Sequence, residues 1–128
     1  MSRLLGFCVS LVLIVVVINH PAFAHDKKGH YAVLGHGTES CGTFIEAANE
    51  GQYQNNWKKW NGFYFWTVGY LSGYNRYVEG LHNIIANTDM RGCMAFVEQY
   101  CRDNPLKDYD SAVNALIKEI EKSRNGES

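Results

Sequence analysis

The stretch from Trp60 to Gly80 reads WNGFYFWTVGYLSGYNRYVEG, and it decides the fold. Its large side chains recur at the 3.6-residue period of a helix and fall on one wide face. A strand from Phe63 to Tyr70 is the alternative on residue type alone, but the helical period is longer and cleaner than any alternation. We therefore expect a long helix over residues 60–80. Its buried face comprises Trp60, Phe63, Trp66, Thr67, Tyr70, Leu71, Tyr74, Tyr77 and Val78.

Four glycines, Gly62, Gly69, Gly73 and Gly80, project onto one narrow edge of this helix. Each glycine lowers the stability of a helix by on the order of 1 kcal/mol relative to alanine. Four glycines in a row along one edge therefore indicate another interaction that offsets this loss. Close approach of a neighbouring helix is the expected gain. A surface groove for a partner is the alternative, and both can hold at once.

The remaining sequence predicts three more helices. Ser40 starts a short helix that ends at Asn49-Glu50-Gly51, and residues 52–59 are expected to be a loop or a frayed lead-in to the next helix. Thr88 is the expected N-cap of the next, which ends at Asn104-Pro105. Asp108 precedes the last of the expected helices. The expected apolar stripes are Cys41, Phe44, Ile45 and Ala48; Met90, Met94, Val97 and Cys101; and Tyr109, Ala112, Val113, Leu116, Ile117 and Ile120.

These elements give an all-α fold, a small four-helix domain over residues 40–122. Before it, residues 25–39 are polar and predicted to be a flexible arm, and residues 123–128 a disordered tail. Arg3, an apolar run from Leu4 to Ile18 and the pattern Ala22-Phe23-Ala24 are typical of a secretory signal peptide over residues 1–24. The run is too short to span a bilayer, so we expect a periplasmic or secreted protein with no integral membrane span.

Composition excludes several partners. The formal net charge is −1, and loss of Arg3 with the signal peptide makes it −2, so no nucleic acid is expected to bind. No serine or cysteine stands in a known nucleophile motif and no glycine-rich loop follows a strand, so we predict no catalytic activity and no cofactor. No metal site is expected, although a new N-terminus at His25 offers an amine and an imidazole to copper.

Three cysteines follow the signal peptide: Cys41, Cys93 and Cys101. On one helix, Cys93 and Cys101 would lie roughly 12 Å apart, too far for a disulfide. The bridge must then join Cys41 to one of them. Cys101 lies nearer the centre of its apolar stripe, which favours Cys41 with Cys101 and leaves Cys93 as a buried free thiol. A bridge from Cys93 to a second copy is the alternative, so the protein is expected to be a monomer or a homodimer.

Several short motifs resemble the HdeA/HdeB family of periplasmic proteins over about residues 41–120: Cys41-Gly42-Thr43-Phe44, Gly69-Tyr70-Leu71-Ser72-Gly73, Asp89 and Tyr100-Cys101-Arg102-Asp103-Asn104-Pro105. The resemblance implies an exported helical domain with one disulfide between the matched cysteines. It also implies an acid-activated chaperone that exposes apolar surface at low pH. A weaker similarity to Tai-type immunity proteins of type VI secretion implies an inhibitor of a toxic periplasmic enzyme.

Both resemblances predict a protein partner, either unfolded periplasmic clients or one enzyme. An acid chaperone needs carboxylates whose protonation loosens the fold. Asp89, Glu98, Asp103, Asp108 and Asp110 are the candidates, and ordinary caps and solvated side chains are the alternative. An inhibitor needs exposed anchors, for which we predict Tyr70, Tyr74 and Tyr77 beside Gly69 and Gly73.

Overall fold

The computed structural model describes residue 26 and residues 28–126. The predicted signal peptide, Cys8, His25 and the last two residues of the predicted tail lie outside the described residues. Residues 26 and 28–31 belong to a unit of their own, in which the Asp26 carboxylate accepts hydrogen bonds from the backbone N–H groups of Lys28 and His30 at 2.8 Å.

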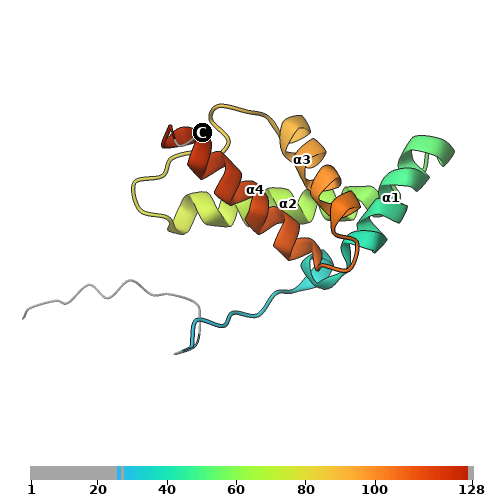
Figure 1. Ribbon diagram of the computed structural model, residues 1–128, viewed down its shortest axis with the longest axis horizontal. Coiled ribbons are helices and arrows are strands. Elements are labelled where there is room, and N and C mark those ends of the chain that lie inside the picture. The colour runs from blue at the N-terminus through green and yellow to red at the C-terminus, as the bar shows by residue number, and fades with distance from the viewer. Residues whose placement is uncertain (1–25, 27, 127–128) are drawn as a thin grey trace, which may run out of the picture. The chain divides into compact units, whose positions relative to one another are not determined.

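The described residues confirm the predicted all-α fold (Figure 1). Its four helices are α1 (Cys41–Gln54), α2 (Lys58–Tyr77), α3 (Met90–Asp103) and α4 (Tyr109–Arg124). A short 3-10 helix, η1 (Gly35–Thr38), precedes α1, and no strand occurs among these residues. The predicted apolar stripes are buried or half-buried except at Tyr77, which lies at the exposed end of α2.

Several predicted boundaries were wrong. Helix α1 continues to Gln54, because Asn55 adopts the left-handed conformation (φ 53°) that ends a helix, so the predicted loop shrinks to residues 55–57. The N-cap of α3 is Asp89 and not Thr88: the Asp89 carboxylate accepts the N–H of Gly92 at 2.8 Å. Helix α2 ends at Tyr77, before a turn in which Gly80 has φ +74°. Helix α4 runs to Arg124, into the predicted tail.

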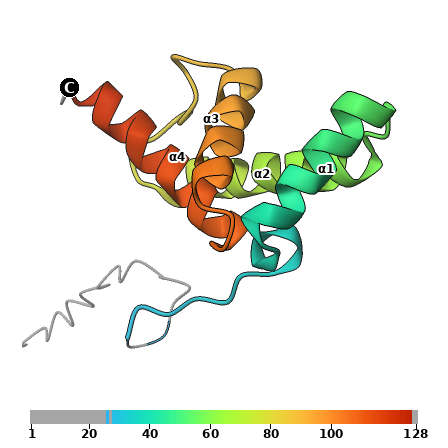
Figure 2. The same ribbon diagram turned by 45° about the vertical axis from the view of Figure 1, so that its right-hand side comes forward.

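The predicted disulfide joins Cys41 at the start of α1 to Cys101 in the last turn of α3, with 4.7 Å between the Cα atoms. Figures 1 and 2 show that the two helices lie close at this end and diverge from it, with α2 passing across them. We call this arrangement the wedge: its apex is the disulfide, and its mouth lies between the end of α1 and the start of α3.

The connection between α3 and α4 is bonded to the apex. The backbone N–H groups of Cys41 and Gly42 donate to the carbonyl oxygens of Lys107 and Pro105 at 2.8 and 3.0 Å. These groups have no acceptor within their own helix, since the first N–H groups of an α-helix lack intrahelical partners. The apex is therefore held by backbone hydrogen bonds as well as by the disulfide.

An aromatic cluster forms the centre of the core. The ring of Tyr109 on α4 lies 4.9 Å from that of Phe44 on α1 and 4.8 Å from that of Phe63 on α2, measured between centroids. The Tyr109 hydroxyl and the Thr67 hydroxyl are 2.7 Å apart, and both side chains are fully buried. This bond satisfies polar groups that would otherwise be costly to bury.

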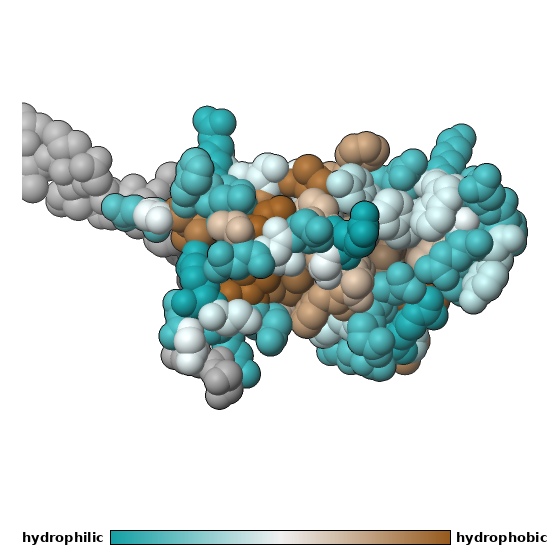
Figure 3. Space-filling view, turned by 90° about the horizontal axis from the view of Figure 1, so that it is seen from above, coloured by the Kyte–Doolittle hydropathy of each residue, from teal (hydrophilic) through white to brown (hydrophobic). Residues whose placement is uncertain are grey.

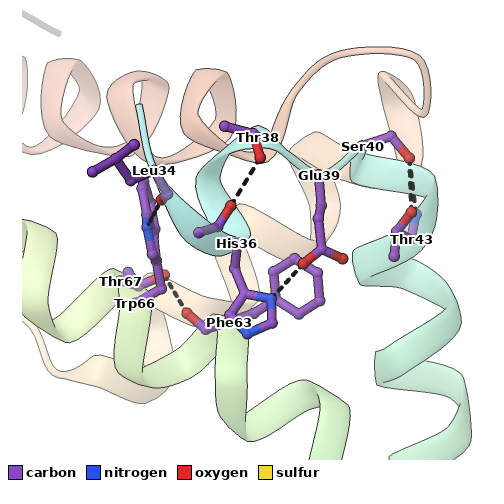
Figure 4. Close-up of polar contacts among 10 residues, drawn as sticks. Leu34, His36, Thr38, Glu39, Ser40, Thr43, Phe63, Trp66 and Thr67 are labelled. Atoms are coloured by element: carbon purple, nitrogen blue, oxygen red, sulfur yellow. Dashed lines mark hydrogen bonds and ion pairs between the residues drawn. The ribbon is translucent and has the colours of Figure 1, made fainter. Parts of the chain in front are cut away.

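The predicted flexible arm is packed over its last part, as Figure 4 shows. The Trp66 indole donates to the Leu34 carbonyl at 2.7 Å, and η1 presents buried Gly37 to the Trp66 ring so closely that an added Cβ would lie 2.2 Å from it. A Cβ on Gly62 would meet the His36 ring at 2.3 Å. Gly62 therefore permits a close approach, as predicted, although the neighbour is η1 and not a long helix.

Candidate functional site

Two of the three tyrosines predicted to bind a partner contact α4 instead. The Tyr70 hydroxyl donates to the Asn114 side chain at 2.9 Å, and the Tyr74 hydroxyl donates to the Glu121 carboxylate at 2.5 Å. Burial and the Glu121 carboxylate raise the pKa of Tyr74 to about 12. Both rings are half-buried against the core. Of the predicted anchors, only Tyr77 is freely exposed, at 81%.

The prediction of a close helix neighbour was wrong at Gly69 and Gly73. A Cβ added at either position would have no atom of another segment within 4 Å. The buried side of α2 carries Thr67 and Leu71, and Tyr70 bonds to α4 through its hydroxyl. Within the described chain, these two glycines therefore serve no packing role.

A groove at the wedge mouth is the best candidate for a binding site. It has a volume of about 420 Å³, within the range of small binding sites. Helices α2 and α3 supply most of its wall, and α1 supplies one residue. The lining residues are Gln52, Trp57, Trp60, Tyr64, Met90, Arg91, Met94, Ala95 and Glu98.

Trp57 is held at the mouth by three neighbours. Its ring lies against Gly51, where an added Cβ would be 2.4 Å from the ring, so α1 needs a glycine here. Its indole N–H donates to the Asn55 side chain at 3.3 Å. Its ring meets that of Trp60 edge to face, with 5.5 Å between centroids. Trp57 nevertheless keeps 39% of its surface exposed, which makes it a pre-positioned aromatic contact.

The remaining wall is apolar and adaptable. Trp60 stacks on Tyr64 with 5.3 Å between centroids, which extends the aromatic surface one turn along α2. Met90 and Met94 face them from α3, and methionine side chains adjust readily to different partners. Trp57 lies in the connection between α1 and α2, directly before the first residue of α2. The spacing of Trp57, Trp60 and Tyr64 at positions i, i+3 and i+7 was the signal for one helical face here.

A second groove, of about 400 Å³, lies between α3, α4 and residues 83–88. Its floor includes Cys93, which is 1% exposed and unbonded, as predicted for this thiol. Burial raises the pKa of Cys93, which keeps the thiol protonated and unreactive. Figure 3 looks down on the molecule from above and shows apolar surface between rows of polar side chains on that face. The aromatic residue in its lining is Phe96, which is partly buried and packs against the core.

The predicted acid-sensing carboxylates are caps and surface partners. Asp89 caps α3, Glu98 pairs with Arg102 at 2.5 Å, and Asp103 accepts hydrogen bonds from the Gln99 amide. Asp110 accepts from Asn114 at 2.9 Å. Asp108 precedes α4 and is exposed. These carboxylates are spread along α3 and α4 and do not form one site.

Comparisons with models of known protein families, with curated proteins and with solved structures found no match. Among the described residues, no three His, Cys, Asp or Glu side chains lie together as they would around a metal ion. In the same part of the chain, no helix is long and apolar enough to cross a membrane. Among the described residues, the wedge mouth is the surface best suited to binding.

Proposed function

We propose that this chain is an exported, non-catalytic binding factor that holds a protein partner at the wedge mouth. The observation that supports this most directly is the position of Trp57, which is partly exposed yet held by Gly51, Asn55 and Trp60. Tryptophan and tyrosine are the side chains that dominate binding energy at protein interfaces. The signal-peptide pattern supports an exported protein.

The mouth is arranged before any partner binds, which favours affinity. Ordering a flexible side chain on binding costs roughly 0.5–1.5 kcal/mol, and a side chain that is already fixed avoids most of that cost. The disulfide and the backbone bonds at the apex hold α1 and α3, and the mouth lies between the end of α1 and the start of α3. Such an arrangement suits a specific partner better than a mixture of unfolded chains.

The test compares two aromatic variants. The oxidised protein, without its signal peptide and immobilised at neutral pH, is mixed with periplasmic extract, and the retained proteins are identified by mass. Trp57→Ala should abolish retention of the specific partner, whereas Tyr77→Ala removes an exposed tyrosine outside the mouth and should leave it unchanged. Equal retention by both variants and the parent protein would contradict the proposal.

Two versions of this function remain. The inhibitor version follows from the rigid mouth and requires binding to one enzyme at neutral pH, with loss of that enzyme's activity. The acid-chaperone version has its own support: two carboxylates bond between helices, Glu50 with Lys59 at 2.6 Å and Glu121 with Tyr74. This version requires that both interhelical contacts break in acid.

One acid experiment separates the versions. The chaperone version predicts that the protein exposes apolar surface to a dye near pH 2 and prevents aggregation of an acid-denatured client. Glu121→Gln removes the carboxylate that accepts the Tyr74 hydrogen bond between α2 and α4, and should increase dye binding in acid. The inhibitor version predicts a folded protein that is inert toward the client under the same conditions.

A further inference from the structure

Among the described residues, no sheet edge lines the mouth. Helices α2 and α3 form most of the groove, and beyond the first turn of each helix their main-chain groups are bonded within the helix. An extended segment lying there would find no sheet edge to join, so its own N–H and C=O groups would go unpaired where they lose water. A helix satisfies its own backbone and presents only side chains. The groove therefore favours a helical segment.

The apolar lining defines what that helix must carry. Trp57 and Trp60 lie on one wall, and Met90 and Met94 lie on the other, one turn apart on α3. A partner helix that enters between these walls contributes side chains at i, i+3 or i+4, and i+7. Large aliphatic side chains at those positions fill the space and gain free energy from burial.

Charge distinguishes which amphipathic helix fits. Arg91 lines the groove, and among the described residues no carboxylate lies within ion-pair distance of it. Glu98 lines it too, but Arg102 holds that carboxylate. Arg91 therefore complements an acidic side chain beside the apolar anchors.

We propose that the wedge mouth binds one face of an amphipathic helix in its partner protein, with aliphatic side chains between the α2 and α3 walls and an acidic side chain facing Arg91. This inference depends on the proposed function, because it names the segment through which the partner binds. It goes further in specifying conformation, anchor spacing and charge.

Tryptophan fluorescence of the protein itself reports binding in this test. Two of its three tryptophans, Trp57 and Trp60, line the groove, and the third, Trp66, is covered by η1. Three designed helical peptides of one length are titrated into the oxidised full chain while tryptophan emission is recorded. The first has leucines on one face flanked by glutamates, the second has the same composition with leucines all around the helix, and the third has lysines in place of the glutamates.

The one-faced acidic peptide should bind at least about tenfold more tightly than the scattered one, because only it presents all its anchors at once. Replacing glutamate by lysine should weaken binding roughly twofold to fivefold, as expected for an exposed ion pair. Arg91→Glu changes an exposed residue and should reverse that preference. Equal affinity for the one-faced and scattered peptides, or an unchanged charge preference in Arg91→Glu, would overturn the inference.

The peptide result also separates this inference from the proposed function. If no peptide binds while Trp57→Ala still abolishes capture of the partner, the partner uses a segment other than an amphipathic helix and the inference fails alone. If neither measurement depends on Trp57, both fail. Tyr77→Ala is the matched control in each experiment, and circular dichroism verifies that every variant is folded.

Discussion

Alanine substitutions at the glycines of α2 test the observation that one side of this helix is open. Gly69 and Gly73 lie inside α2, neither has a positive φ, and an added methyl group would contact nothing. An alanine at each position should therefore recover the helix propensity that glycine loses, roughly 0.5–1 kcal/mol. For a domain of this size, that free energy raises the melting temperature by roughly 2–8 °C per substitution.

Gly37→Ala is the matched control, because the same chemical change meets a filled site. Its Cβ would lie 2.2 Å from the Trp66 ring and 2.5 Å from the Val33 side chain. Forcing a methyl group into a packed site costs roughly 1–3 kcal/mol, so this variant should melt at a lower temperature than the parent protein.

The assay is thermal and urea unfolding followed by helical circular dichroism, at several protein concentrations. Stabilisation by Gly69→Ala and Gly73→Ala with destabilisation by Gly37→Ala is the expected pattern. If Gly69→Ala lowered the melting temperature, the α2 edge would be covered in solution, and the description of an open face would be refuted. A melting temperature that depends on concentration would identify a second copy as the cover.

Four further outcomes are expected. Replacing Cys41 and Cys101 together by serine should lower the free energy of unfolding by about 4 kcal/mol in the chain-entropy model, because the bridge closes a 60-residue separation; an unchanged urea midpoint would contradict this. Thr67→Val should lower the free energy of unfolding by roughly 1–3 kcal/mol, because it leaves the buried Tyr109 hydroxyl without its partner. Tyr109→Phe should cost less, because the Thr67 hydroxyl keeps its bond to the Phe63 carbonyl. Equal losses in urea unfolding would argue against the bond between the two hydroxyls. Burial raises the pKa of Tyr109 above the value of about 10 that it has in the unfolded chain. The neutral phenol therefore stabilises the fold fully below about pH 10, and this contribution is lost as the pH rises toward the folded-state pKa. The urea midpoint should accordingly fall less at alkaline pH in Tyr109→Phe than in the parent protein. Cys93 should react with a thiol reagent at the rate of unfolding, and rapid labelling of the native protein would show that its site opens.

The sequence predicted the fold because burial leaves a periodic signal. The stripes of α2, α3 and α4 are regular, and the spacing of Cys93 and Cys101 excluded a bridge between them. Boundaries were harder to predict. Asn55 ends α1 through a left-handed conformation that many residues other than glycine avoid, and Asp89 competes with Thr88 for the same cap.

The binding site was harder to predict because exposure depends on tertiary packing. Tyr70 and Tyr74 share a face with core residues, and only the position of α4 shows that their hydroxyls are bonded. Trp57 stands in a polar stretch before the expected helix, and its spacing to Trp60 and Tyr64 does not show that its ring stays partly exposed. Its role depends on Gly51, six residues earlier, whose missing side chain makes room for the indole ring.

Helix α1 acts as a lever arm about the cystine. Its 14 residues span roughly 20 Å, so a rotation of about 5° at Cys41 would displace its far end by roughly 2 Å. A displacement of that size is comparable to the bond lengths of the side chains that must fit between Trp57 and Met94. Binding at the mouth should consequently be more sensitive to reduction of the cystine than the helix content is.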